Sequence, residues 1–273
     1  MNSPRTLPSG LWADTLPSVI RAIGTEQFAP ALDSALRAVA GFDISCIFSY
    51  TLQARPRLLH DGLNHVSTSA VMANYLNGTY LLDAVYDACR RDMPTGLYRL
   101  SALAPDQFFE GEYYNSPEFH PCISMETGAL SEEIVFFTRI HDSYIAYSLM
   151  RQQAHPLFSE QEFAALQTTA TTVIALMESQ WRGRFPVSGS AENEDPKDTQ
   201  LSQAMDTFGG DVLTARERLI ATMILRGHST VSIAANLGLS EGTVKNHRKH
   251  IYAKLQVYSQ SGLFSLFIQH IFD

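Results

Sequence analysis

The segment LTARERLIATMILRGHSTVSIAANLGLSEGTVKNHRKHIYAKL, from Leu213 to Leu255, decides how the C-terminal part of the chain folds. It opens on a capping box, in which Thr214 can accept from the amide three residues on while Glu217 reaches back. Apolar residues then follow at helical spacing until Gly227, which can adopt the left-handed conformation that ends a helix. The pattern predicts a first helix between these signals.

Two further short helices follow Gly227, joined by a tight turn. Ser229 or Thr230 can cap the first of them, and Gly238 ends it. Ser240 opens the next helix only two residues later. Two helices joined by a short glycine-containing turn predict a helix-turn-helix motif.

The helix that begins at Ser240 has two chemically different faces. Val244, His247 and Ile251 recur at steps of three and four, and Leu255 continues the stripe, so we expect these residues to pack inward. The other side carries cations and an amide, which can neutralise phosphates or pair with base edges in a major groove. A solvated basic helix is the alternative, and the preceding helix and turn disfavour it. The candidate DNA-binding residues are Thr243, Lys245, Asn246, Arg248 and Lys249.

This segment resembles the DNA-binding domain of LuxR-type transcription regulators. The resemblance covers Leu213 to about Leu263 and is carried chiefly by the run TVKNH at 243–247, followed by Ile251 and Lys254-Leu255. It implies an all-α, four-helix domain that binds double-stranded DNA, with RNA polymerase as a candidate partner. The chain departs from the family pattern at 230–232, where a polar Asn-Lys-Glu run is usual, and at Gln260, where an arginine is common.

A fourth helix is predicted after Ser259. Its apolar stripe is wider than a short terminal helix can easily hide alone, which favours a homodimer contact. Packing of the stripe only onto its own domain is the alternative. The stripe consists of Leu263, Leu266, Phe267 and Ile271.

Charge is unevenly shared along the 273 residues, whose formal net charge is −8. From Leu213 onward seven Lys and Arg stand against three Asp and Glu, a net +4, which leaves −12 for the remainder. This imbalance favours nucleic-acid binding through the C-terminal part alone and argues against a membrane-surface role for the body. Three widely spaced cysteines, the absence of a signal peptide and the absence of a spanning apolar run predict a cytoplasmic protein.

The N-terminal part is predicted to be an α/β sensor domain, an antiparallel sheet flanked by helices, of GAF- or PAS-like type. Residues 1 to about 14 are expected to be a loose lead-in, and Ile145, Tyr147 and Leu149 to give their strand one buried face. The domains are predicted at 1–182 and 212–273, joined by a polar linker at 183–211. The expected elements are helices within 16–40, 66–77, 83–91, 105–114 and from Ser159 to Trp181, and strands at 43–51, 57–60, 133–140 and 144–152.

A small-molecule site is predicted around the stretch YLNGTYLLDAVY, residues 75–86. Tyrosines give apolar walls with hydroxyl tips, and a carboxylate among them could hold a ligand nitrogen by a charge-assisted hydrogen bond. The alternative is that Asp83 caps a helix and the aromatic residues are core. Glu132 and Glu133 are expected to precede a strand and to be solvated. The candidate ligand-binding residues are Tyr75, Tyr80, Asp83, Tyr86, Phe108 and Tyr113.

The same stretch is similar to the ligand-binding domain of LuxR-type quorum-sensing regulators. The similarity implies that Asp83 binds a ligand nitrogen, with Tyr75 and Tyr80 lining the pocket. Ala84 stands where proline is usual, and the tryptophans that shape an acyl-homoserine lactone site are absent. We therefore expect another small effector that bears an amine or amide, as in solo regulators of this kind.

The sequence offers no sign of an enzyme. His120-Pro-Cys122 lacks the further ligands of a metal site, and neither a phosphate-binding loop nor a nucleophile elbow appears. We expect no catalytic residues, no metal and no cofactor. Two alternatives remain: control by a partner protein, and control by phosphorylation as in response regulators, although no acidic pair follows the first strand.

Overall fold

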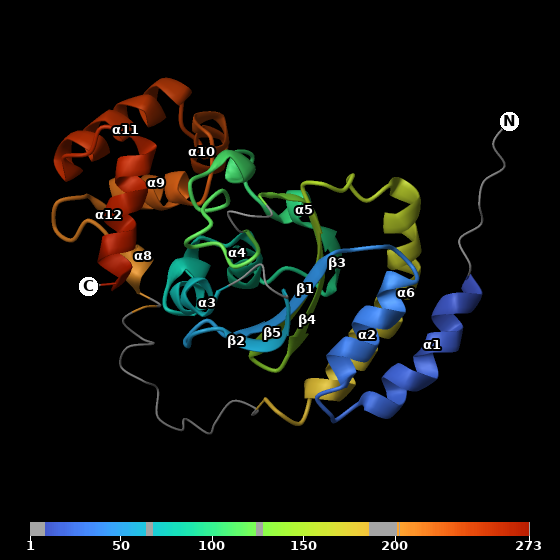
Figure 1. Ribbon diagram of the computed structural model, residues 1–273. Helices are drawn as coiled ribbons and strands as arrows, with labels where there is room; N and C mark the ends of the chain where they lie inside the picture. The colour runs from blue at the N-terminus through green and yellow to red at the C-terminus, as the bar shows by residue number, and fades with distance from the viewer. Residues whose placement is uncertain (1–8, 64–67, 124–127, 186–200, 202, 273) are drawn as a thin grey trace, which may run out of the picture.

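A five-stranded antiparallel sheet forms the centre of the N-terminal part (Figure 1). The computed structural model describes residues 9–63, 68–123, 128–185, 201 and 203–272. The antiparallel prediction is confirmed, and a parallel receiver fold is excluded for this sheet. Its strands, in the order β2-β1-β5-β4-β3, are β1 (Ile44–Tyr50), β2 (Arg57–Gly62), β3 (Gly96–Arg99), β4 (Leu130–Ile140) and β5 (Ser143–Gln152).

Two helices, α2 (Phe28–Arg37) and α6 (Glu160–Trp181), cover one face of the sheet, and α1 (Ser9–Ala22) packs against α2 on the outside. The predicted capping box at the start of α6 is present, since Ser159 accepts from the Glu162 amide and Glu162 accepts from the Ser159 amide. The expectation of a loose lead-in over residues 1 to about 14 is wrong for residues 9–14, which are helical, whereas residues 1–8 lie outside the described residues. Trp12 packs against the core and Val19 is fully buried, so the helix extends back to Ser9.

Shorter elements cover the opposite face: α3 (Ser69–Leu76), η1 (Thr79–Leu82), α4 (Ala84–Arg90), α5 (Leu100–Leu103) and η2 (Phe108–Glu110). The helix expected over 105–114 is reduced to the single turn η2. The Asn115 side chain donates to the carbonyls of Phe109 and Gly111, which competes with helical hydrogen bonds there. The sequence did not predict β3 or α5, each of which has only four residues.

The sheet is therefore a middle layer with both faces covered. β5 is buried along nearly its whole length, which corrects the expectation of a single buried face. Ile145, Tyr147 and Leu149 face α2 and α6, whereas Tyr144, Ala146 and Met150 face α3 and α4. Alternation cannot be seen in the sequence of a strand whose two faces are both apolar.

The C-terminal helices are α8 (Ala204–Thr207), α9 (Ala215–Leu225), α10 (Thr230–Leu237), α11 (Glu241–Leu255) and α12 (Gln260–Phe272). The capping box of Thr214 and Glu217 begins α9, and Ser229 and Ser240 cap α10 and α11 as predicted. Gly238 ends α10 in the left-handed conformation at φ 63°. The helix-turn-helix prediction is confirmed. Most of the expected linker, at 186–200 and 202, lies outside the described residues.

The C-terminal helices lie beyond α3 and α4, on the side of the sheet opposite α2 and α6 (Figure 1). Their apolar residues join those of α3, η1 and α4 in one continuous buried cluster. The two parts of the chain therefore share a core in this arrangement.

Candidate effector site and nucleic-acid interface

Asp83 lies where α3, η1 and α4 meet. One carboxylate oxygen accepts from the Val85 amide at 2.8 Å and so caps α4, while the other accepts from the Tyr75 hydroxyl at 2.7 Å. The Tyr75 and Tyr50 hydroxyls are 2.6 Å apart. Burial raises the pKa of Asp83, and these hydrogen bonds oppose that rise. The alternative role expected for Asp83, as the cap of a helix, is present, but the cap uses only one of its two carboxylate oxygens.

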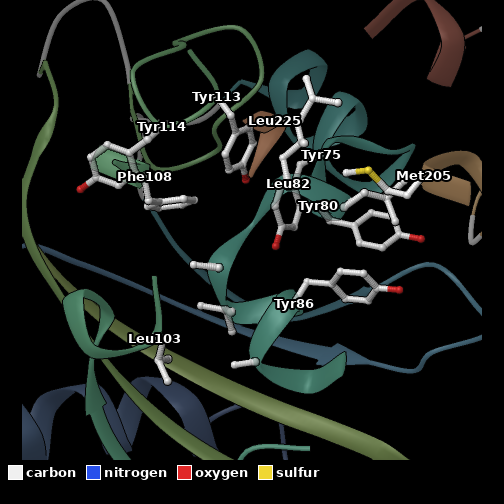
Figure 2. Packing of buried hydrophobic residues seen from close by; sticks show 14 of the residues in the cluster. Tyr75, Tyr80, Leu82, Tyr86, Leu103, Phe108, Tyr113, Tyr114, Met205 and Leu225 are labelled. Atoms are coloured by element: carbon white, nitrogen blue, oxygen red, sulfur yellow. The ribbon is translucent and has the colours of Figure 1, made fainter. Parts of the chain in front are cut away.

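Five of the six predicted ligand-binding residues, all except Asp83, belong to one buried cluster (Figure 2), and Asp83 joins it through its hydrogen bond with Tyr75. The Tyr80 ring meets the Tyr86 ring edge-on with centroids 4.8 Å apart, and the Tyr75 ring lies 6.4 Å from that of Tyr80. The Phe108 and Tyr113 rings are 6.3 Å apart. The sequence reading missed Tyr50, which enters the cluster from β1, because nothing local to that strand distinguishes it from ordinary core.

The Tyr113 hydroxyl is an exception among these polar groups. The side chain is 3% exposed, and within the described ranges its oxygen has no hydrogen-bond partner. A buried hydroxyl without a partner costs about 1–3 kcal/mol of stability. The site therefore holds a polar atom that its own side chains leave unsatisfied.

Glu133 also belongs to this region, contrary to the expectation that it is solvated. β4 begins at Leu130, so Glu132 and Glu133 lie inside the strand and point to opposite faces. Glu132 forms an ion pair with Arg99 and accepts from the Phe158 amide at 2.6 Å. Glu133 is 7% exposed, and burial together with Asp83 raises its pKa to about 8.

The proposed DNA-binding face of α11 is open to solvent. Val244 and Ile251 are fully buried on the inner side, while His247 and Leu255 are only half-buried. Thr243, Lys245, Asn246 and Lys249 are exposed. Arg248 is held half-buried by hydrogen bonds to the Thr230 and Tyr252 hydroxyls, each at 3.3 Å.

Lys254, although part of the C-terminal motif, has a structural partner. Its ammonium group lies 2.7 Å from Glu217, the same carboxylate that completes the capping box of α9. The hydrogen bond from Lys254 and that from the Thr214 amide lower the pKa of Glu217 to about 2. This ion pair joins the end of α11 to the start of α9 and so fixes the orientation of α11.

The two parts of the chain meet at the turn between α9 and α10. Arg226 pairs with Asp87 of α4 at 2.9 Å and is 12% exposed, and burial lowers its pKa to about 10. Two of its guanidinium nitrogens, Nε and Nη2, have no partner in the described part of the chain. Asp106 accepts from the Ser229 amide at 2.9 Å. These contacts bring the N-terminal part against the first turn of α10.

Gly227 permits the closest approach at this contact. Its amide carbonyl accepts from the Gln107 amide at 2.9 Å, and its φ is 88°. A side chain there would place its Cβ 2.6 Å from the Phe108 Cα. Only glycine fits both the backbone conformation and the space.

The apolar side of α12 packs on α9 of its own domain and also against the N-terminal part, where Ile271 lies against Gly78, so its packing goes beyond the alternative of contacts within its own domain only. Leu263 and Phe267 are fully buried. Phe264 lies 5.8 Å from Phe119 between ring centroids, and Phe272 stacks on the other side at 6.5 Å. A dimer formed through this stripe would require the two parts to separate first.

In the described ranges, no three His, Cys, Asp or Glu side chains gather as a metal site. None of the helices described is both long and apolar enough to cross a membrane.

Comparison with known proteins identifies what the chain resembles. The family of bacterial regulatory proteins described as the luxR family matches residues 211–267. A transcriptional regulator of the HTH type in the exeN 3′ region of Aeromonas salmonicida is 33% identical over 194 residues, which are 69% of this chain and 94% of that protein. The transcriptional regulatory protein MctR of Rhizobium johnstonii is 39% identical over 62 residues, 23% of this chain and 29% of its own length.

A solved structure also resembles the N-terminal part. The VqsR LBD domain from Pseudomonas aeruginosa aligns with a TM-score of 0.53 at 22% identity, over 65% of this chain and 99% of that domain. At this identity the likeness shows a shared fold and leaves the ligand of this chain open.

Proposed function

Because the chain belongs to the LuxR family of bacterial regulatory proteins, we propose that it is a cytoplasmic transcription factor that answers to a small effector. Membership of this family of DNA-binding regulators also makes it a non-enzymatic protein. The observation that carries the proposal is the polar cluster around Asp83, which lies one helical turn from the contact with the DNA-binding part. The domains are proposed at 1–182 and 212–273.

α11 is the proposed recognition helix. Lys245, Lys249 and Asn246 are exposed on one side, while Val244 and Ile251 anchor the other. Such a helix can lie in a major groove with its cations on phosphates and its amide at a base edge. We assign Thr243 and Arg248 to the same interface, with Arg248 changing its partners when DNA binds.

α4 is the proposed link between effector and DNA. Asp83 caps its first turn, and Asp87, one turn later, pairs with Arg226. An effector that draws the Asp83 carboxylate away from Val85 or Tyr75 loosens the start of α4 and so changes the Asp87–Arg226 contact. Ligand binding can shift a domain equilibrium only through such a difference in contacts.

Release of this contact would also expose α12. The stripe of α12 would then be free to form the proposed homodimer, which can place two recognition helices about one turn of duplex apart. RNA polymerase is a candidate partner of the DNA-bound dimer. Control by a partner protein that docks on the same contact is the alternative to a small effector.

A DNA-binding titration tests the nucleic-acid half of this proposal. The probe is a duplex selected by the full chain from a random 30-base-pair library. Lys245→Ala and Lys249→Ala should each weaken binding and lower the slope of log affinity against log salt by about 0.9. Arg21→Ala, an exposed cation on α1, is the matched control and should leave the slope unchanged. Equal slopes for all variants would contradict docking through α11.

A further inference from the structure

Glu133 places a second carboxyl group on the face of the sheet that α3, η1 and α4 cover. Val135 and Phe137, which follow it at two-residue steps, belong to the same buried cluster as Tyr75 and Tyr80. Ser148 of β5 is its hydrogen-bond partner. A buried glutamate on an inner strand is costly unless another charge compensates it.

The described residues supply no such charge. The ion pairs found among them include neither Glu133 nor Asp83. His120 lies in the same region, with its ring 5.1 Å from that of Tyr113, but burial lowers its pKa to about 3. It is therefore neutral near pH 7 and does not compensate either carboxylate.

The unpartnered Tyr113 hydroxyl is an independent sign at the same place. It is buried, and the charges of both Asp83 and Glu133 act on it. Both carboxyl groups therefore lie near enough to act electrostatically on a buried phenol oxygen that has no partner among the described residues. All three can accept hydrogen bonds.

We propose that Glu133 is a second acidic anchor of the effector site, and that Asp83, Glu133 and Tyr113 together select an effector with a protonated amino group. This inference rests on the proposed effector role. It narrows the chemical class of the effector from amines and amides to protonated amines. An ammonium group carries three donors, one for each oxygen-bearing side chain. The surrounding tyrosine rings add cation–π attraction. A neutral amide would leave Glu133 protonated, whereas a cation would favour its ionised form.

A melting-temperature screen of the full chain tests the charge requirement. The probes are 2-phenylethylamine and the n-alkylamines from butylamine to octylamine, each beside its neutral analogue: phenylacetamide, 2-phenylethanol and alcohols of equal length. We expect amines to raise the melting temperature and the neutral analogues to have no effect.

Substitutions then test the residue. Glu133→Gln should weaken the best amine at least tenfold while circular dichroism confirms the fold. Glu132→Gln is the matched control, because its side chain points to the opposite face of β4 toward Arg99, and it should leave amine affinity unchanged. Equal losses in both variants would overturn the assignment of Glu133 as an anchor.

Proton release gives a readout that a purely structural role would not change. With a pKa of about 8, Glu133 is about nine-tenths protonated at pH 7, so its ionisation by a bound cation frees about 0.9 proton. Calorimetry in phosphate and in Tris measures this number. The wild-type chain should release close to one proton per amine, and Glu133→Gln should release none.

The outcomes separate the inference from the function on which it rests. If phenylacetamide binds as well as the amine, without proton release but with dependence on Asp83, the effector site stands and the cationic inference is overturned. If no probe binds, both the inference and the proposed effector role fail. The proton count of the wild-type chain needs no variant, so misfolding of Glu133→Gln would not prevent the test.

Discussion

Two buried carboxyl groups on opposite faces of the same sheet have opposite properties. Asp33 on α2, 6% exposed, accepts from the Ser45 hydroxyl at 2.6 Å and the Tyr147 hydroxyl at 2.5 Å, and lies 3.3 Å from His60. Its pKa is lowered because these partners outweigh burial. Glu133, 7% exposed, has one hydroxyl partner and a pKa raised to about 8.

The difference shows that burial alone does not set the state of a carboxyl group. On the α2–α6 face a complete set of partners holds Asp33 as an anion and ties a helix to the sheet. On the α3–α4 face the set is incomplete at Glu133 and at Tyr113. Buried polar groups whose hydrogen bonds are all formed are typical of a structural network, whereas buried polar groups that lack partners are typical of a binding site.

The largest effect is expected at the complete site. Asp33→Ala removes the acceptor of two buried hydroxyls and the partner of His60, so the free energy of unfolding should fall by about 3–5 kcal/mol. Urea unfolding measures it, and amine binding at the other face should persist in the folded fraction. A loss below about 1 kcal/mol would show that the network is not holding α2 in place.

Glu133→Gln should have the opposite sign. Because the folded pKa of about 8 exceeds the ordinary value of 4.5, the folded state holds a proton that the unfolded state releases, and stability declines as pH rises from about 4.5 to 8. The decline amounts to about 4 kcal/mol by pH 8, so the substitution, which removes it, should raise the free energy of unfolding at that pH by about this amount. Melting curves from pH 5 to 8 would show it, and parallel profiles for both chains would contradict it.

A smaller effect is expected where the incomplete face meets the DNA-binding part. Asp87→Asn weakens the pair with Arg226, and without effector it should raise DNA affinity about five- to tenfold. Arg91→Ala is the control, because it removes the other partner of Asp87 together with a hydrogen bond to the Leu103 carbonyl and leaves Arg226 in place. Fluorescence anisotropy with the selected duplex measures both. Unchanged affinity in Asp87→Asn would separate this contact from DNA binding.

The smallest expected effects form a matched pair of tyrosines. Tyr113→Phe removes an unpartnered hydroxyl and should stabilise the chain by about 0.5–1 kcal/mol. Tyr147→Phe removes a donor to Asp33 and should destabilise it by about 1 kcal/mol. Thermal unfolding of both variants under the same conditions compares the two faces directly. If both variants changed the melting temperature in the same direction, the two faces of the sheet would not differ in the way proposed.

Local signals in the sequence predicted where several helices begin and end. The capping boxes at Thr214 and Ser159 and the glycine at 238 act within a few residues, so their consequences appear in the sequence itself. The contact between Asp83 and Tyr75 was also within reach of the sequence, since both lie within a dozen residues, and their role in binding a ligand stays a prediction.

The remaining features depend on long-range packing. Glu133 was misassigned because β4 begins three residues earlier than predicted, and because the facing layer determines which of two adjacent glutamates is buried. The Arg226–Asp87 pair joins residues far apart in the sequence, so no local pattern could indicate it. The helix expected over 105–114 does not form, because the Asn115 side chain donates to the carbonyls of Phe109 and Gly111. Helix propensities of the individual residues do not predict these hydrogen bonds.

The glycine at position 227 has an evolutionary consequence. Because the backbone of Gly227 lies directly against that of Phe108, even one added methyl group would push the N-terminal part and the C-terminal helices apart. Under the proposed regulation, a change at this single codon would weaken the contact through which the effector acts and would also strain the end of α9, where φ is 88°.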